Sequence, residues 1–233
     1  MRHSLTFAIA GSLLVFGAAA HATSFDDGIF GHGWYDAKVV DTTAGSLATY
    51  SAQQLSTGGN PTHHREVTHS YGFGAIVVAH WKSAFTYDPS SSGGLSSLNY
   101  SFDLIHKQPP GGQAVAYRLL VRQGGVDFVG PIHGIFPAVW QTFSGTGLTA
   151  TSFNNLLANG ATGTLNPDFG STGSPLTFGY ISANSNPNSG TTSVRISGID
   201  NYHVGIVPEP GTIAALAVGI SAVVARRRRR RSV

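Results

Sequence analysis

Residues 95–106 read LSSLNYSFDLIH, and their alternation of apolar and polar side chains decides the fold class. Four apolar residues of this stretch share one face of an extended chain: Leu98, Tyr100, Phe102 and Leu104. The polar residues between them share the other face: Asn99, Ser101 and Asp103. Because successive side chains of a β-strand point to opposite faces, this period of two predicts a strand that is buried on one face only. Such strands are typical of two packed antiparallel sheets.

Similar short runs of β-branched and aromatic residues lie on both sides of this strand. Turn sequences separate them, for example GGNP at 58–61 and PPGG at 109–112. Nine further strands are predicted, at 34–41, 48–55, 65–71, 75–85, 114–123, 126–129, 138–144, 176–182 and 193–207. Residues 151–158 could form one or two helical turns. The sequence therefore predicts an all-β body over 23–205, a two-sheet β-sandwich of jelly-roll type.

The charge of the chain is concentrated at its ends. Of the 14 Lys and Arg residues, six form the run 226–231. Residues 23–207 hold seven basic and ten acidic side chains, so this body has a net charge of about −3. Nucleic-acid-binding domains carry a basic face, and we therefore expect no nucleic-acid partner. Cysteine is absent, which excludes disulfides and cysteine-ligated zinc.

The N-terminus has the three parts of a secretory signal peptide. A positive start, Met1 to His3, precedes a largely apolar run at 5–20. Ala20 and Ala22 then place small residues at the −3 and −1 positions of a cut before Thr23. We predict a signal helix over 1–22 that is removed by signal peptidase.

The C-terminus begins with VPEPGT at 207–212 and continues into an apolar run. We predict a transmembrane helix over 211–225, with the body outside the membrane. The basic run that follows would act as a cytoplasmic stop: Arg226, Arg227, Arg228, Arg229, Arg230 and Arg231. Each proline fixes its own φ and disfavours helix in its predecessor, so Pro208 and Pro210 are expected to hold Glu209 in an extended, accessible strand.

This three-part end, over roughly 206–233, closely resembles the PEP-CTERM sorting signal. The resemblance implies processing by an exosortase, a membrane protease that cleaves near the motif and releases or transfers the body. Pro208, Glu209 and Pro210 would be its recognition element. An ordinary tail anchor is the alternative interpretation. The stretch GIDNYHV at 198–204 resembles the last strand of jelly-roll domains in the galactose-binding and concanavalin-like groups.

The body shows no catalytic constellation. Glycoside hydrolysis needs two carboxyl groups across the scissile bond, and Glu66 is the only glutamate at 23–207. His63, His64 and His69, with Arg65 and Glu66 between them, lack the spacing of a zinc site, although a weak adventitious metal site could form there. We expect solvent-exposed side chains in a loop and edge strand. The sequence predicts no enzyme activity, no cofactor and no metal centre.

Aromatic side chains are the remaining candidates for ligand binding. Aromatic rings suit the C–H faces of sugars, and a few polar groups can then fix the orientation. The aromatic candidates are Trp34, Tyr35, Trp81, Tyr87, Trp140 and Tyr202. Asp200 and Asn201 could form hydrogen bonds with sugar hydroxyls. The same aromatics could instead fill the core. Asp200 and Asn201 could equally support a structural calcium ion.

These patterns together favour an exported, membrane-anchored protein that reaches the cell surface or the extracellular matrix. The preferred role is non-enzymatic, adhesive or structural, within an envelope or exopolysaccharide. A carbohydrate-binding module with a defined pocket is one alternative, and a hydrolase with an atypical Asp/His site is another. The expected partners are signal peptidase, an exosortase-type protease, the membrane and a polysaccharide.

Overall fold

The computed structural model describes residues 23–107, 114–135, 138–188 and 191–209. The predicted signal peptide with Ala20 and Ala22, the predicted helix at 211–225, Pro210 and the arginine run all lie outside these residues. Among the described residues, no helix is long and apolar enough to cross a membrane.

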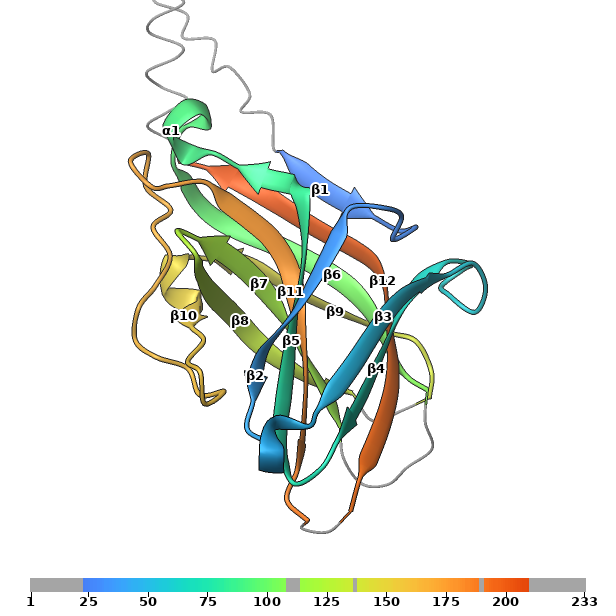
Figure 1. The fold of residues 1–233 in the computed structure, drawn as a ribbon. Coiled ribbons are helices and arrows are strands. Elements are labelled where there is room, and N and C mark those ends of the chain that lie inside the picture. Colours follow the sequence, from blue (N-terminus) through green and yellow to red (C-terminus); the bar gives the residue numbers. More distant parts are fainter. Residues whose placement is uncertain (1–22, 108–113, 136–137, 189–190, 210–233) are drawn as a thin grey trace, which may run out of the picture. The chain divides into compact units, whose positions relative to one another are not determined.

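Within the described residues, twelve strands form two antiparallel sheets (Figure 1). Sheet A has the order β3-β4-β12-β6-β9, and β1 also pairs with β12. Its strands are β1 (Ser24–Asp27), β3 (Thr49–Leu55), β4 (His64–Tyr71), β6 (Leu95–His106), β9 (Gln141–Leu148) and β12 (Ser193–Pro208). Sheet B has the order β10-β8-β7-β11-β5-β2. Its strands are β2 (Trp34–Asp41), β5 (Gly74–Tyr87), β7 (Val115–Gln123), β8 (Val126–Ile135), β10 (Asn154–Asn155) and β11 (Leu176–Asn186).

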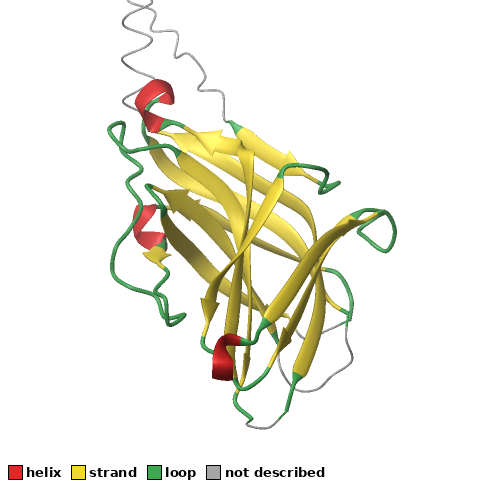
Figure 2. Ribbon diagram, in the orientation of Figure 1, coloured by secondary structure: helices red, strands yellow, loops and turns green. Residues whose placement is uncertain are grey.

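Helix is confined, within the described residues, to three short segments (Figure 2). These are η1 (Ala44–Ser46), α1 (Pro89–Ser92) and η2 (Ala150–Ser152). The side chain of Asp88 caps α1 by accepting a hydrogen bond from the Ser90 backbone N–H, 2.9 Å away. The helical turns expected at 151–158 are therefore mostly wrong, because only 150–152 is helical and β10 follows at once.

The predicted two-sheet β-sandwich is confirmed. All ten predicted stretches contain a strand, and the bounds of β2 and β6 agree to the residue. The short strands β1 and β10 were not predicted. The last strand, β12, continues to Pro208, three residues beyond the expected end of the body at 205.

The core between the sheets follows the alternation read from the sequence. The apolar face of β6 is 2% exposed or less at Leu98, Tyr100, Phe102 and Leu104. In β12 the alternation changes phase at a β-bulge, where the pairing with β6 shifts between Asp200 and His203. Asn201 has a φ of 49°, a left-handed conformation that Asn tolerates better than most residues. Ile199 before the bulge and Tyr202 after it are therefore both buried.

A second apolar cluster lies on the outer face of sheet B. Its buried members come from five strands: Val40, Val77, Ala79, Leu120, Val129 and Ile181. Leu156 packs against this cluster, and its backbone N–H donates to the carbonyl of Asp127 at 2.8 Å. Leu156 also forms an isolated bridge with Thr162. The hairpin around 156–162 thus covers part of a sheet face that also carries exposed side chains.

Candidate functional site: an aromatic row on sheet B and the sorting junction

A row of side chains crosses the outer face of sheet B from its edge inward. It consists of Tyr35 in β2, Trp81 in β5, Arg122 in β7 and Asp127 in β8, and we call it the aromatic row. Tyr35 and Trp81 are register partners whose ring centroids lie 6.0 Å apart with an interplanar angle of 20°. The Arg122 guanidinium carbon lies 3.9 Å from the centroid of the Trp81 ring. Its Nε lies 2.7 Å from Oδ1 of Asp127, which completes the row with an ion pair.

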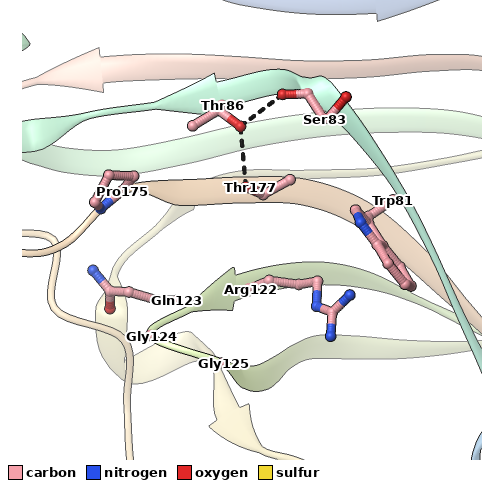
Figure 3. A pocket seen from close by; sticks show the side chains of 9 residues that line it. All are labelled: Trp81, Ser83, Thr86, Arg122, Gln123, Gly124, Gly125, Pro175 and Thr177. Atoms are coloured by element: carbon pink, nitrogen blue, oxygen red, sulfur yellow. Dashed lines mark hydrogen bonds between the residues drawn. The ribbon is translucent and has the colours of Figure 1, made fainter. Parts of the chain in front are cut away.

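A glycine lies opposite Trp81 in the neighbouring strand. Strand β11 lies between β5 and β7, and it places Gly179 opposite Trp81 on one side and Leu120 on the other. A Cβ at Gly179 would lie 1.9 Å from the carbonyl oxygen of His80. Position 179 therefore has no room for a side chain. Arg122, which pairs with Thr177 of β11, contacts the indole from β7 (Figure 3).

The two faces of the Trp81 ring have different neighbours. Since β2 and β7 lie on opposite sides of β5 in the sheet, Tyr35 and Arg122 approach Trp81 from opposite sides. The most open ring of the row is that of Tyr35, which lies on the edge strand and is 52% exposed. Tyr35, rather than Trp81, therefore offers a free aromatic face.

A cavity of about 290 Å³ adjoins the row (Figure 3). Its lining residues come from β5, β7 and β11 and the turns beside them: Trp81, Ser83, Thr86, Arg122, Gln123, Gly124, Gly125, Pro175 and Thr177. The Thr86 hydroxyl donates to the Ser83 carbonyl at 2.9 Å and lies 3.0 Å from the Thr177 hydroxyl. The lining contains hydroxyls, an amide and one guanidinium, but no carboxylate or imidazole.

The charges of the row nearly cancel. Arg122 is the cation, and Asp127 beside it is the anion. Burial raises the pKa of Asp127 above its ordinary value, while the charge of Arg122 acts in the opposite direction. The surface around the cavity is therefore suited to an uncharged, hydroxyl-rich ligand more than to a polyanion.

The tryptophans predicted to bind a ligand do not converge. Trp34 points between the sheets, where its ring packs against Phe30, Phe85 and Tyr202 at centroid distances of 5.2, 5.9 and 5.5 Å. Its Nε1–H donates to Oδ2 of Asp27 at 2.9 Å. Trp140 lies edge-on to His64 of β4, 5.5 Å between centroids, and its Nε1–H donates to the Gly58 carbonyl at 3.2 Å. Trp81 alone of the three lies in the aromatic row.

Tyr202 and Tyr87 are not the exposed aromatics that the sequence suggested. Tyr202 is 1% exposed because the bulge at Asn201 turns its ring into the core, and its hydroxyl donates to the Gly179 carbonyl at 3.0 Å. Tyr87 is also buried, and its hydroxyl donates to the Gly93 carbonyl at 2.8 Å. Both rings are covered by protein and belong to the core.

Asp200 and Asn201 anchor a loop. The two Asp200 oxygens accept the backbone N–H groups of Asn60 and Asn201, at 2.6 and 2.7 Å. Asn201 Nδ2 donates to the Asn60 carbonyl and to Oδ2 of Asp103, each at 2.7 Å. Burial raises the pKa of Asp200 above its ordinary value, and the backbone N–H groups act against that rise. Among the described residues, no group of three or more His, Cys, Asp or Glu side chains is arranged to hold a metal ion.

The expectation that the histidine cluster is exposed is wrong. His64, Arg65 and His69 are buried because β4 lies between β3 and β12, not at the sheet edge. Arg65 and His69 share the inward face of β4 with the apolar residues Val67 and Tyr71. That alternation was visible in the sequence, and it was the signal that should have indicated burial.

Arg65 and His69 belong to an inter-sheet network that joins β4 to three strands of sheet B. Its members are Asp36, Arg65, His69, His80, Ser182 and Asn184. Arg65 Nη2 donates to Oδ2 of Asp36 at 2.6 Å, and Asp36 Oδ1 lies 2.6 Å from His80 Nδ1. His80 Nε2 lies 2.9 Å from Ser182 Oγ, which lies 3.1 Å from His69 Nε2. His69 Nδ1 lies 2.7 Å from Asn184 Oδ1 and completes the network.

The distances among Asp36, His80 and Ser182 resemble those of a Ser-His-Asp triad. His80 and Ser182 are fully buried between the sheets, so a substrate cannot reach the serine, as nucleophilic catalysis requires. Burial lowers the pKa of His80 and lowers that of His69 to about 4. Burial alone would raise the pKa of Asp36, but His80 and Arg65 outweigh it and lower the pKa. The network therefore links the two sheets through hydrogen bonds and ion pairs.

The sorting junction is the end of β12, where the body meets the Pro-Glu-Pro motif. Pro208 pairs with Leu95 of β6, and the Ser96 hydroxyl donates to the Val207 carbonyl at 3.1 Å. The backbone N–H of Glu209 donates to the Gly94 carbonyl at 3.0 Å, and Glu209 is half-buried. The accessible strand expected at Glu209 is thus wrong, because the first two motif residues pack on the sandwich.

The last strand of this antiparallel β-sandwich is followed directly by a Pro-Glu-Pro sequence. These two features define the class of protein: a β-sandwich protein with a C-terminal sorting signal. Residues 207–230 match the family model of the PEP-CTERM protein-sorting motif. The chain therefore carries a motif that marks an exported substrate of exosortase sorting to the cell surface. No match is found among curated proteins.

Several solved structures are similar to this chain. A family 11 carbohydrate-binding module from Clostridium thermocellum has 14% identity and a TM-score of 0.45, over 79% of this chain and 95% of that chain. An exo-β-agarase has 14% identity and a TM-score of 0.42, over 78% of this chain and 24% of that chain. A carbohydrate-binding module that recognises mannan has 12% identity and a TM-score of 0.39, over 79% and 96%. No functional conclusion follows from similarity at this level.

Proposed function

We propose that this exported protein is a non-enzymatic adhesive module that holds an uncharged polysaccharide of the envelope or extracellular matrix. The observation that carries the proposal is the aromatic row, with the open Tyr35 ring at its edge and the hydroxyl-lined cavity beside Trp81. The sorting motif supplies the setting, since it directs the body to the cell surface.

The chemistry of the row matches a neutral sugar chain. The ring of Tyr35 suits the C–H face of a pyranose, and the rings of Tyr35 and Trp81 are already stacked and need little ordering on binding. Hydroxyls of Ser83, Thr86 and Thr177 can exchange hydrogen bonds with sugar hydroxyls. The ion pair between Arg122 and Asp127 leaves no net charge to attract a polyanion, and the body between 23 and 207 is itself weakly acidic.

The same site supports binding without turnover. General acid–base chemistry on a sugar needs a titratable pair beside the scissile bond, and the cavity lining offers neither carboxylate nor imidazole. Asp127 is held in the ion pair with Arg122. The other buried carboxylates described above are engaged elsewhere, Asp36 in the inter-sheet network and Asp103 and Asp200 at the loop of Asn60.

Affinity electrophoresis in gels that contain β-glucan, mannan, agarose or the acidic polymer alginate tests the proposal. We expect the body to be retarded by at least one neutral polymer, and Tyr35→Ala to weaken that binding about tenfold, which is about 1.4 kcal/mol. Phe73→Ala is the matched control, because Phe73 is 49% exposed but lies outside the row. Equal retardation of Tyr35→Ala and wild type, retardation by alginate alone, or no retardation would overturn the proposal. Release of reducing sugar by the purified body would refute the non-enzymatic part.

A further inference from the structure

Gly94 and Glu209 touch at the point where the sandwich meets the sorting motif. The Glu209 N–H donates to the Gly94 carbonyl at 3.0 Å, and the Glu209 side chain lies over the glycine. A Cβ at position 94 would lie 2.7 Å from Cδ of Glu209 and 2.8 Å from its Oε2. Gly94 does not have a left-handed φ, so the contact requires the space of a glycine and not its backbone freedom.

The surface under Glu209 is fixed by other contacts. The Tyr87 hydroxyl donates to the Gly93 carbonyl at 2.8 Å, and the Leu95 N–H donates to the Phe169 carbonyl at 2.9 Å. The turn that holds Gly94 is therefore tied to the core on both sides. Burial raises the pKa of Tyr87, and the nearby charge of Glu209 adds to that rise.

We propose that Gly94 is a positioning residue for the sorting reaction, because it keeps Glu209 docked until the end of β12 opens. A protease takes up a substrate segment as an extended strand whose backbone groups are free. Here the Glu209 N–H is already bonded, the Val207 carbonyl accepts a bond from Ser96, and the Glu209 side chain is half-buried. Recognition of the motif must follow a local opening of these contacts, whose free energy is set by the body. The sandwich thereby controls the rate at which it is processed.

Gly94→Ala separates this role from the stability of the body. The added Cβ collides with the Glu209 carboxyl group, the end of a flexible side chain, which must move off position 94. We expect the full-length Gly94→Ala chain to be processed about twofold faster than wild type, because the displaced carboxyl group loosens the docking of Glu209 without removing its backbone hydrogen bond. Pulse-chase labelling and mass analysis in the cells that make the chain measure the rate. Gly72→Ala is the matched control, because a Cβ there meets nothing within 4 Å.

Hydrogen exchange measures the docking directly. In the full-length chain in detergent, we expect the Glu209 amide to be protected in wild type and Gly72→Ala and to exchange faster in Gly94→Ala, at an unchanged melting temperature. Ser96→Ala, which removes the bond to Val207, should act in the same direction more weakly and serves if Gly94→Ala does not fold. Exchange of the wild-type Glu209 amide at the rate of a free peptide would overturn the proposal. So would processing of the folded Gly94→Ala chain at or below the rate of Gly72→Ala.

Discussion

Acidification should destabilise the sandwich between pH 6.5 and about 4, through the buried imidazole of His69. Burial lowers the pKa of His69 from 6.5 to about 4, so within this window the unfolded chain binds a proton that the folded chain does not. The free energy of unfolding therefore falls as the pH falls, and below pH 4 both states are protonated and the dependence ends. At about 1.4 kcal/mol per pH unit, the loss is about 3 kcal/mol.

Urea denaturation of the body, monitored by tryptophan fluorescence at several pH values, measures this loss. We expect His69→Gln to be less stable than wild type at pH 7 but to lose about 3 kcal/mol less between pH 6.5 and 4. His32→Gln is the control, because His32 lies on an exposed turn. His80 contributes in the same direction, since burial lowers its pKa too, so some dependence on pH remains in the variant. An identical loss in wild type and His69→Gln would refute the reasoning.

Two further predictions concern close contacts. Gly179→Ala should lower the free energy of unfolding by about 3 kcal/mol or prevent folding, because its Cβ would meet the His80 carbonyl at 1.9 Å. Urea denaturation, with Gly72→Ala as the control, measures this loss, and a change below about 0.5 kcal/mol would contradict the prediction. Asn60→Ala should speed proteolytic nicking of the 56–63 loop severalfold, because it removes the 3.0 Å bond from Asn60 Nδ2 to Asp103, and limited proteolysis with mass analysis measures the rate; unchanged nicking would show that the backbone contact to Asp200 suffices.

The strands were predictable because their side-chain alternation is local. In 95–106, Leu98, Tyr100, Phe102 and Leu104 all face the other sheet, and no distant partner is needed to see the pattern. Strands β1 and β10 are different, since Ser24–Asp27 and Asn154–Asn155 have little pattern and are strands only because β12 and β8 lie beside them. The bulge at Asn201 was not predicted either, because a change of register depends on the partner strand.

The candidate site was only partly predictable for the same reason. Trp81 was a candidate from its residue type, but its neighbours Arg122 and Asp127 come from strands about 40 residues further along the chain. The burial of His69 could have been predicted from its alternation with Val67 and Tyr71, but its partners Asn184 and Ser182 could not, because they lie more than 100 residues away in sequence. Residue type indicates what a side chain can do, whereas the register between strands decides what it meets.

The position of β12 has a consequence for the order in which the sandwich can form. Sheet A has no direct pairing between β4 and β6, because β12 fills the place between them, and β1 also depends on β12. Until β12 is present, sheet A therefore lacks its middle strand. A chain that ends before β12 cannot complete this sheet, so we expect it to remain more open to proteases than the chain that contains β12.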